Sequence, residues 1–316
     1  MIRVVGANPA MDRISTWPPL RLASVNRAAT VTVVPGGKGF NVARAAVRLG
    51  EEAAIYGFLG GHVGEALREM ISADGVTDRH TTIAAGTRVC FIVVEPEVGR
   101  STVLNEPGPE VTPEEVVRLL DDLRSECQRG DLVVLSGSLP DSVAPAVAAE
   151  VVKIGNDAGA RTIVDIHSEA LRVAVAQRPW MLKCNRRELL QLLGASDAGA
   201  TASVPGLARE MQRVRERGIA IVVVTMGAAG ALVADADGVV HAQVPQIEEV
   251  NPTGSGDLLL AGLAVGIQGG QAVREAIALG VACGTAGATH LPPELPPGFD
   301  PAGWTTDIDV EVVGLA

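Results

Sequence analysis

A carboxylate at the end of a glycine-rich turn carries the strongest chemical signal in this sequence. Residues 251–257 read Asn-Pro-Thr-Gly-Ser-Gly-Asp and run directly into an apolar stretch. Glycines before a helix leave backbone N–H groups uncovered and the helix dipole adds positive potential, so Gly254, Ser255 and Gly256 are suited to hold a phosphoryl group. Asp257 would then be close enough to take the proton of an attacking hydroxyl, as phosphoryl transfer requires. An Asp that only caps a helix after a glycine turn explains the segment equally well.

A second glycine-rich loop carries a cation and an amide. Residues 36–44 read Gly-Gly-Lys-Gly-Phe-Asn-Val-Ala-Arg, which indicates a loop that runs into a helix. Lys38 and Asn41 suit a polar or phosphorylated substrate, and a structural turn would need neither of them. The spacing of a Walker A loop is absent, and no GxGxxG follows the first predicted strand, which argues against a dinucleotide-binding oxidoreductase.

An amide and a carboxylate stand three residues apart in the segment 183–188, Lys-Cys-Asn-Arg-Arg-Glu. At a strand-to-helix junction Asn185 and Glu188 can point the same way, and they could hold hydrated Mg²⁺, which takes few protein ligands. A capping box, in which Glu188 bonds back to the backbone of Asn185, is the somewhat better interpretation of the spacing alone.

Other polar or glycine-containing positions carry weaker signals. Residues 225–230, Thr-Met-Gly-Ala-Ala-Gly, end a predicted strand with two glycines, which would let a flat or phosphorylated ligand approach closely. A plain hairpin turn explains them nearly as well. Asp12, Arg27 and Arg88 each stand alone, and an isolated polar residue is more often a solvated surface group. For His167 a structural role is favoured over a catalytic one, because no nucleophile partner is evident.

The elements that must position these residues follow from an alternation of apolar runs with helical patterns. Strands are predicted at 2–6, 53–58, 131–135, 161–165, 180–184 and 220–225. Helices are predicted at 40–49, 63–73, 113–124, 143–158, 205–217, 257–267 and 271–288. This alternation predicts an α/β fold with a parallel sheet and helices on both faces. Ligands of such sheets bind beyond the carboxyl ends of the strands, where the sequence places Asn8, residues 136–138 and Asp165.

Two segments break the alternation and predict a small lid. Residues 13–35 contain a β-rich run, and residues 87–104 read as a hairpin around Pro96-Glu97-Val98-Gly99. Neither segment is followed directly by a crossover helix, so we expect an antiparallel flap attached to the main sheet. The sequence shows no internal repeat and no low-complexity linker. We therefore expect a single domain over 1–316, with the lid formed by about 13–35 and 87–104.

Composition argues against several classes of protein. The 316 residues carry 26 Lys+Arg against 37 Asp+Glu, a net charge of −11, and 3% aromatic residues, whereas a nucleic-acid surface needs basic stripes and stacking rings. No apolar run approaches the ~18 residues of a membrane helix, and the start of the chain reads as a strand rather than a signal peptide. The four cysteines form no CxxC pair, which argues against a disulfide framework or a zinc site. We expect a cytoplasmic protein with small-molecule ligands and no nucleic-acid or membrane partner.

Taken together, these segments resemble the PfkB family of ribokinase-like carbohydrate kinases over nearly the whole chain. The early Gly-Gly-Lys-Gly-x-Asn-Val-Ala and the late Gly-Ser-Gly-Asp are that family's two signatures. Further segments look like the branch that acts on sugar phosphates: Asn-Pro-Ala-Met-Asp at 8–12, Val-Asn-Arg at 25–27, Gly-Thr-Arg at 86–88, Ser-Gly-Ser-Leu-Pro at 136–140 and the segment 183–188. Residues 251–257 and Glu-Pro-Gly-Pro at 106–109 look closest to tagatose-6-phosphate kinases, with 1-phosphofructokinases next.

The resemblance implies a ribokinase-like, doubly wound domain whose β-sheet lid clasps a second subunit to form a homodimer, and it implies ATP and Mg²⁺ as cofactors. It implies that Asp257 is the base, with the amides of Gly254, Ser255 and Gly256 as an anion hole. The implied sugar contacts are Asp12, Gly37 and Asn41, and the implied contacts to a substrate phosphate are Arg27, Lys38, Arg88 and Ser138. Asn185 and Glu188 would organise Mg²⁺ through water, and the nucleotide site would include Lys183, Asn185, Thr225, Gly227 and Gly230.

The expected function is transfer of the γ-phosphate of ATP to a hydroxyl of a ketohexose phosphate, namely tagatose 6-phosphate, fructose 1-phosphate or fructose 6-phosphate. A kinase of an unphosphorylated sugar or nucleoside is the nearest alternative, and the cations Arg27, Lys38 and Arg88 disfavour it because a neutral sugar needs no cation cluster. A catalytically silent sugar-phosphate-binding protein is a further alternative, which an intact Asp257 disfavours.

Two departures from the family pattern could alter nucleotide or sugar contacts. Cys184 stands where a proline is usual, and His167 and Ser168 follow Asp165 where a small polar pair is more common.

Overall fold

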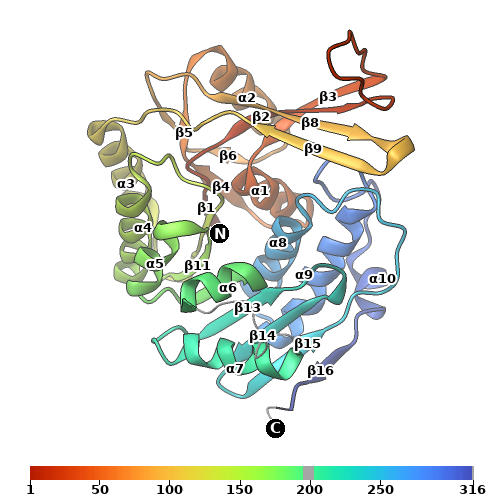
Figure 1. Cartoon of the computed structure of the whole chain (residues 1–316). Coiled ribbons are helices and arrows are strands. Elements are labelled where there is room, and N and C mark those ends of the chain that lie inside the picture. The colour runs from red at the N-terminus through yellow and green to blue at the C-terminus, as the bar shows by residue number, and fades with distance from the viewer. Residues whose placement is uncertain (195–202, 315–316) are drawn as a thin grey trace.

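A large, mainly parallel sheet forms the centre of the computed structural model, which describes residues 1–194 and 203–314 (Figure 1). Within these residues the sheet has ten strands in the order β16-β15-β14-β13-β12-β11-β10-β1-β4-β6. The parallel strands are β6 (Thr77–Asp78), β4 (Ala53–Tyr56), β1 (Ile2–Val5), β10 (Leu132–Ser136), β11 (Arg161–Asp165), β12 (Met181–Asn185) and β13 (Ile221–Thr225). The antiparallel strands are β14 (Ala231–Asp235), β15 (Gly238–Ala242) and β16 (Val310–Val312).

Helices cover both faces of this sheet, so the prediction of a doubly wound α/β fold is confirmed. One face packs against α3 (Pro113–Glu126), α4 (Ala144–Ala158), α5 (Ser168–Ala176), α6 (Arg186–Leu193) and α7 (Val204–Arg215). The other packs against α1 (Lys38–Arg48), α2 (Gly61–Ala73), α8 (Ser255–Gln268), α9 (Val273–Ala288) and α10 (Pro301–Thr306).

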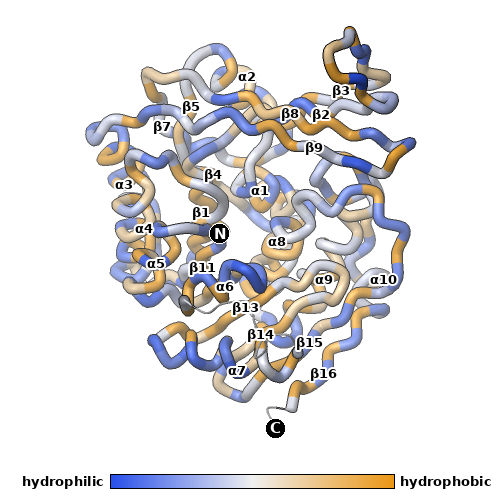
Figure 2. The backbone as a smooth tube through the Cα atoms, viewed as in Figure 1, coloured by the Kyte–Doolittle hydropathy of each residue, from blue (hydrophilic) through white to orange (hydrophobic). Residues whose placement is uncertain are grey.

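The central strands are apolar on both faces because both faces are covered. In β10, Val133 and Leu135 belong to the core beneath α3 and α4, while Leu132 and Val134 belong to the core beneath α1 and α8. A strand alternates its side chains between the two faces, so a continuous apolar run is what a doubly covered parallel strand needs. Figure 2 shows apolar stretches along β13 and β14 and hydrophilic residues on α7.

Close packing between α8 and α9 fixes the position of the start of α8. A Cβ atom added at Gly284 of α9 would lie 2.8 Å from the backbone oxygen of Ser255, and one added at Gly280 would lie 2.8 Å from that of Leu259. Glycine at these two positions lets the two helices touch through their backbones, which holds the glycine-rich turn before α8 against a rigid support.

A separate four-stranded sheet, which we call the small sheet, lies above the carboxyl edge of the main sheet (Figure 1). Its order is β3-β2-β8-β9, with β2 (Ala10–Thr16), β3 (Thr30–Gly36), β8 (Arg88–Glu95) and β9 (Arg100–Asn105). The pairs β2–β3 and β8–β9 are antiparallel, whereas β2 and β8 run parallel. These strands coincide with the segments predicted to form a lid. The expectation of a purely antiparallel flap was wrong, because β8 returns from α2 in the same direction as β2.

The remaining elements were not predicted or carry little of the architecture. Strands β5 (Phe58–Leu59) and β7 (Thr81–Thr82) form a two-stranded sheet, and short 3₁₀ turns cover Pro96–Val98 and Gly227–Ala229. The sequence analysis missed the hairpin β14–β15, helix α5 and the elements α10 and β16 of the tail. No helix in the described residues is long and apolar enough to cross a membrane.

Candidate active site

Two cavities meet at the glycine-rich turn before α8. The first, of about 250 Å³, lies between the small sheet and the carboxyl edge of the main sheet, and Gly254 and Asp257 form part of its wall. The second, of about 580 Å³, is walled by Ser255 and Gly256 together with α9 and the strand ends of β13. One four-residue turn therefore separates two ligand-sized spaces, and a group transferred between them would have to pass it.

The backbone of this turn presents uncovered N–H groups. Gly254 adopts the left-handed conformation, with φ 84°, immediately before α8, where glycine is the favoured residue. Neither Gly254 nor Gly256 donates its backbone N–H to another described residue, whereas the N–H of Ser255 donates to the backbone oxygen of Pro252 at 3.2 Å. Two of the three amides expected in an anion hole are thus available, and Ser255 lines the second cavity.

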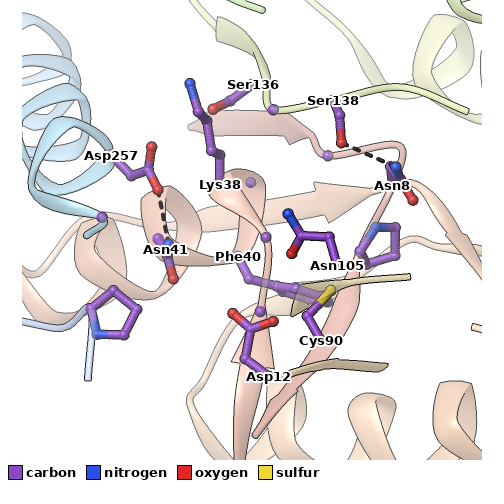
Figure 3. Close-up of a pocket in the computed structure, with 18 of the residues that line it drawn as sticks. Asn8, Asp12, Lys38, Phe40, Asn41, Cys90, Asn105, Ser136, Ser138 and Asp257 are labelled. Atoms are coloured by element: carbon purple, nitrogen blue, oxygen red, sulfur yellow. Dashed lines mark hydrogen bonds between the residues drawn. The ribbon is translucent and has the colours of Figure 1, made fainter. Parts of the chain in front are cut away.

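Asp257 is the third residue of α8 and does not cap it, so the capping alternative is wrong for this residue. Its side chain is buried, at 5% exposure, and its Oδ2 accepts a hydrogen bond of 2.8 Å from Nδ2 of Asn41 (Figure 3). Burial raises the pKa of the Asp257 carboxyl, and the positive charges of Lys38 and Lys183 oppose that rise only in part. A carboxylate with a raised pKa is a stronger base, as proton abstraction requires.

Two lysines converge on a buried carboxylate beside the same turn. Asp165, 1% exposed at the end of β11, accepts from Nζ of Lys183 at 2.8 Å and from Nζ of Lys38 at 3.3 Å. Burial acts to raise the pKa of Asp165, but the charges of Lys183 and Lys38 outweigh it and the pKa is lowered. A Cβ atom added at Gly256 would lie 3.3 Å from Nζ of Lys183. Asp165 therefore holds two cations next to the uncovered amides, where negative charge would be stabilised.

A row of polar side chains crosses the small sheet and faces the first cavity. Asp12 pairs with Cys90 and Cys90 with Asn105 across three neighbouring strands, and all three line the cavity (Figure 3). Burial raises the pKa of Asp12 to about 6, with the nearby charge of Arg88 acting in the opposite direction. A Cβ atom at Gly36 would lie 2.0 Å from Cγ of Asp12, so glycine is needed there to leave room for the carboxylate.

A cation and a hydroxyl lie at the other end of the first cavity. The guanidinium of Arg88 donates to the backbone oxygens of Asn8 at 3.0 Å and Glu106 at 3.2 Å. Oγ of Ser138, in the loop after β10, accepts from Nδ2 of Asn8 at 3.0 Å (Figure 3). This end of the cavity offers the charged and neutral donors that a phosphate binds.

The second cavity contains the glycines predicted to approach a nucleotide. Thr225, Gly227 and Gly230 line it, and a Cβ atom at Gly230, with φ 85°, would lie 2.0 Å from the backbone oxygen of Ala242. The hairpin alternative for this segment is also correct, because the turn joins β13 to β14. The second cavity is also lined by residues of the segment 244–249 and of α9. In α9 the buried hydroxyl of Thr285 has no hydrogen-bond partner among the described residues.

Several predicted site residues lie outside both cavities. Asn185 and Glu188 form a capping box at the start of α6, since the side chain of each accepts from the backbone N–H of the other at 2.9 Å. The described residues contain no group of three or more His, Cys, Asp or Glu side chains that could hold a metal. Lys183 is buried behind the turn, and Arg27 is exposed in the loop between β2 and β3. Arg27 lines neither cavity, and its predicted contact with a substrate phosphate stays a prediction.

The structure adds cavity residues that the sequence analysis did not nominate. The first cavity also includes Cys90, Asn105, Pro293 and His167, the last of which had been interpreted as structural. The alternation of the small sheet was the available signal for Cys90, which stands two residues after Arg88 and so on the same face. Asn105 becomes identifiable only through the pairing of β9 with β8.

Comparisons with known proteins agree with this geometry. Residues 3–291 match the family described as pfkB family carbohydrate kinase. The 1-phosphofructokinase of Bacillus subtilis (strain 168) is 32% identical over 279 residues, which cover 88% of this chain and 89% of the relative. The crystal structure of phosphofructokinase-2 from Escherichia coli in complex with fructose-6-phosphate superimposes with a TM-score of 0.85 at 26% identity, covering 91% of this chain and 93% of the other.

A more distant structure confirms the fold. The ribokinase of Thermotoga maritima gives a TM-score of 0.77 at 19% identity and covers 97% of this chain and 99% of the other. The predicted ribokinase-like fold is therefore correct. With a family match over nearly its whole length and two cavities joined at the glycine-rich turn of Asp257, the chain belongs to the PfkB family of carbohydrate kinases.

Proposed function

We propose that this enzyme transfers the γ-phosphate of ATP to a hydroxyl of a fructose phosphate bound in the first cavity. The observation that carries the proposal is the shared wall of the two cavities, where uncovered amides, two lysines and a buried carboxylate of raised pKa meet. These are the parts that phosphoryl transfer needs: positioning, stabilisation of charge and a base.

Fructose 1-phosphate is the first acceptor to test. A relative of 32% identity carries the name 1-phosphofructokinase, and a structural neighbour was solved with fructose 6-phosphate. The end of the first cavity that contains Arg88 and Ser138 suits a phosphate that is already on the sugar, because Arg88 is a charged donor held by backbone oxygens and the Ser138 hydroxyl is held by the side chain of Asn8. Asp12, Gly37 and Asn41 also line this cavity, and we propose that they bind the sugar hydroxyls.

The proposed mechanism assigns a task to each group around the turn. Asp257 takes the proton of the attacking hydroxyl, and the hydrogen bond from Asn41 holds its carboxylate in place. The amides of Gly254 and Gly256, with Ser255 as the third predicted member, bind the oxygens of the phosphoryl group in transit. Lys38 and Lys183 stabilise the negative charge that develops on this phosphoryl group. The ion pairs with Asp165 hold both ammonium groups in place.

We assign ATP to the second cavity, with its triphosphate directed at the turn of α8. Thr225, Gly227 and Gly230, which line this cavity, are proposed to bind the nucleotide, and Lys183 and Asn185, which lie outside it, are proposed to act on the triphosphate only. The residues present fit Mg²⁺ held through water rather than by direct ligation, because Asn185 and Glu188 already satisfy each other's backbone. Bound to the triphosphate, the ion would neutralise part of its charge.

The test is turnover by the purified protein with ATP and Mg²⁺ over a panel of acceptors. We expect ADP formation with fructose 1-phosphate, fructose 6-phosphate or tagatose 6-phosphate at a kcat/KM far above that for fructose or ribose. Equal activity on free and phosphorylated sugars would contradict the assignment of the acceptor. Tight binding of a sugar phosphate without turnover would instead support a silent binding protein.

We also propose that the small sheet is a lid and that two copies of the chain pair through it. The face of the small sheet that points away from the cavity carries exposed apolar side chains, with Val31 at 52%, Val33 at 39%, Phe91 at 39% and Leu104 at 56% exposure. A soluble protein normally covers such an apolar surface, and a second copy would do so with two-fold symmetry.

Sedimentation of the protein at micromolar concentration tests the pairing. We expect a dimer that Leu104→Lys dissociates, while the matched change Val117→Lys on exposed α3 leaves it intact. A fully active wild-type monomer would contradict the proposal. A cytoplasmic location is proposed as well, since ATP and sugar phosphates are made there and all four cysteines are free.

A further inference from the structure

Asn8 connects the two groups at the phosphate end of the first cavity. It lies between β1 and β2, and it lines the cavity itself. Its backbone oxygen accepts from the guanidinium of Arg88, on the small sheet, at 3.0 Å. Its side-chain Nδ2 donates to Oγ of Ser138, on the main sheet side, at 3.0 Å. One residue thus joins the charged donor to the neutral donor, and Figure 3 shows its bond to Ser138.

The direction of the Asn8–Ser138 hydrogen bond decides what Ser138 can do. A serine hydroxyl has one proton to donate and two lone pairs that accept. Because Asn8 donates, it occupies a lone pair of Oγ and leaves the proton of Ser138 free to point into the cavity. A serine hydroxyl can donate or accept a hydrogen bond. The bond from the Asn8 amide leaves the Ser138 hydroxyl able to donate to the ligand, and an anionic ligand needs donors.

The oxygen of the Asn8 side-chain amide shows that this arrangement is energetically unfavourable for Asn8 itself. Oδ1 of Asn8 is buried and has no hydrogen-bond partner in residues 1–194 and 203–314. An unpaired buried acceptor is unfavourable, and such exceptions cluster at functional sites. Gly108 packs against the side-chain amide of Asn8, since a Cβ atom at Gly108 would lie 3.0 Å from both Oδ1 and Nδ2. Glycine at position 108 leaves the room that the amide needs to sit flat against Ser138.

We propose that Asn8 is a positioning residue that fixes the Ser138 hydroxyl as a donor toward the phosphate of the incoming sugar, and so determines the preference for phosphorylated over free sugars. The proposal rests on the proposed function, because it assumes that a substrate phosphate binds at Arg88 and Ser138. The contact with Arg88 uses only the backbone of Asn8, so a change of its side chain leaves that contact in place.

The decisive variants change the polarity of position 8 at nearly constant shape. In Asn8→Asp the carboxylate accepts the proton of Ser138 and removes it from the ligand, so we expect the KM for fructose 1-phosphate to rise roughly tenfold to a hundredfold. In Asn8→Ala the hydroxyl is only released, and we expect a several-fold smaller rise. The KM for ATP should stay unchanged in both variants, and the kcat/KM for free fructose should fall much less than that for fructose 1-phosphate. The matched control is Asn156→Asp, an equal change of charge at an exposed position of α4.

A double variant separates positioning from direct binding. If Asn8 acts through Ser138, then Asn8→Ala should add nothing to the KM increase of Ser138→Ala, whereas independent contacts would add in full. Full additivity, or a ratio of kcat/KM for fructose 1-phosphate to that for fructose that is the same in Asn8→Asp as in the wild type, would overturn the proposal. If Asn8→Asp does not fold, the Asn8→Ala cycle alone decides the question. A wild-type enzyme with no preference for phosphorylated sugars would refute the proposed function itself, which is a different outcome.

Discussion

The start of α8 and the small sheet face each other across the first cavity, yet they are built in opposite ways. The groups around α8 are buried and tied to one another, with Asp165 at 1% and Asp257 at 5% exposure, and they rest on helices whose backbones touch. The small sheet is a single layer whose outer face exposes Phe91 and Leu104, and its polar row belongs to strands rather than to a packed core.

This difference teaches which part of the reaction each region controls. Phosphoryl transfer requires groups held within fractions of an ångström, which only the packed region can provide. Recognition of a sugar phosphate needs the right donors and acceptors, and a sheet that moves can supply them while opening to admit the substrate. Changes near α8 should therefore lower kcat or stability, and changes on the small sheet should raise KM for the sugar.

The largest effect is expected at the base. Asp257→Asn should fold and bind ATP as before but lose about 10²–10⁴-fold in kcat, the usual contribution of a general base. Steady-state kinetics and calorimetric ATP titration measure the two quantities, with Asp122→Asn on exposed α3 as the control. A kcat within roughly threefold of the wild-type value would remove Asp257 from the role, since that lies well below the usual range.

The buried ion cluster of Asp165, Lys38 and Lys183 should contribute to the free energy of unfolding. Asp165→Asn leaves Lys183 buried without its partner, which typically costs about 3–5 kcal/mol of unfolding free energy. Glu150→Gln removes the partner of exposed Lys153, whose ion pair of 2.7 Å is as short as the 2.8 Å pair of Lys183, and should cost less than about 1 kcal/mol. Urea unfolding of both variants makes the comparison, and equal costs would show that the cluster is no more constrained than the surface.

The small sheet should respond in substrate binding. Arg88→Ala should weaken binding of the sugar phosphate by about 1.5–3 kcal/mol, the value of a charge-assisted hydrogen bond, and leave ATP binding unchanged. Separate KM values for the two substrates test this, with Arg172→Ala, an exposed residue of α5, as the control. A loss shared equally by both substrates would point to a folding defect instead.

The smallest expected effect is a change in pH dependence. Because burial raises the pKa of Asp12 to about 6, this carboxyl becomes protonated as pH falls through that value and ceases to be an anionic acceptor for a sugar hydroxyl. The kcat/KM for the sugar phosphate should therefore decrease below about pH 6. Asp12→Asn should lower kcat/KM at neutral pH and abolish this decrease near pH 6. The decrease in kcat at low pH that comes from protonation of the base, Asp257, should remain. If the decrease in kcat/KM below about pH 6 is the same in Asp12→Asn as in the wild type, it comes from another group.

Most of the main sheet and its helices could be predicted because each element has a local pattern. Continuous apolar runs marked β10 and β13, and periodic spacing marked α1, α8 and α9. Helix α5 escaped because its start has no capping side chain and Ser168 has φ 66°, so no start signal exists. The hairpin β14–β15 escaped through overlooked turn chemistry, since Asp237 and Gly238 form a dipeptide that favours such turns.

The candidate site divides along the same line. Asp257, Lys38 and Asn41 were found because they stand inside short motifs whose chemistry is readable. The partnership of Lys38 and Lys183 with Asp165 was not foreseen, because the ends of β11 and β12 and the start of α1 bring these residues together from distant parts of the chain. Cys90 and Asn105 likewise depend on strand register rather than on neighbours in the chain.

The parallel pairing of β2 with β8 has a consequence for the order in which the chain assembles. Strand β8 reaches β2 only after α1, β4 and α2 have been made, and pairings between such distant segments form slowly. During synthesis the small sheet can be complete once residue 105 has emerged, long before Asp257 is translated. Phe91 and Leu104 are then exposed on a nascent chain whose catalytic half does not yet exist. Under the pairing proposed above, two neighbouring ribosomes on one message would present matching apolar faces before the catalytic half of either chain is made.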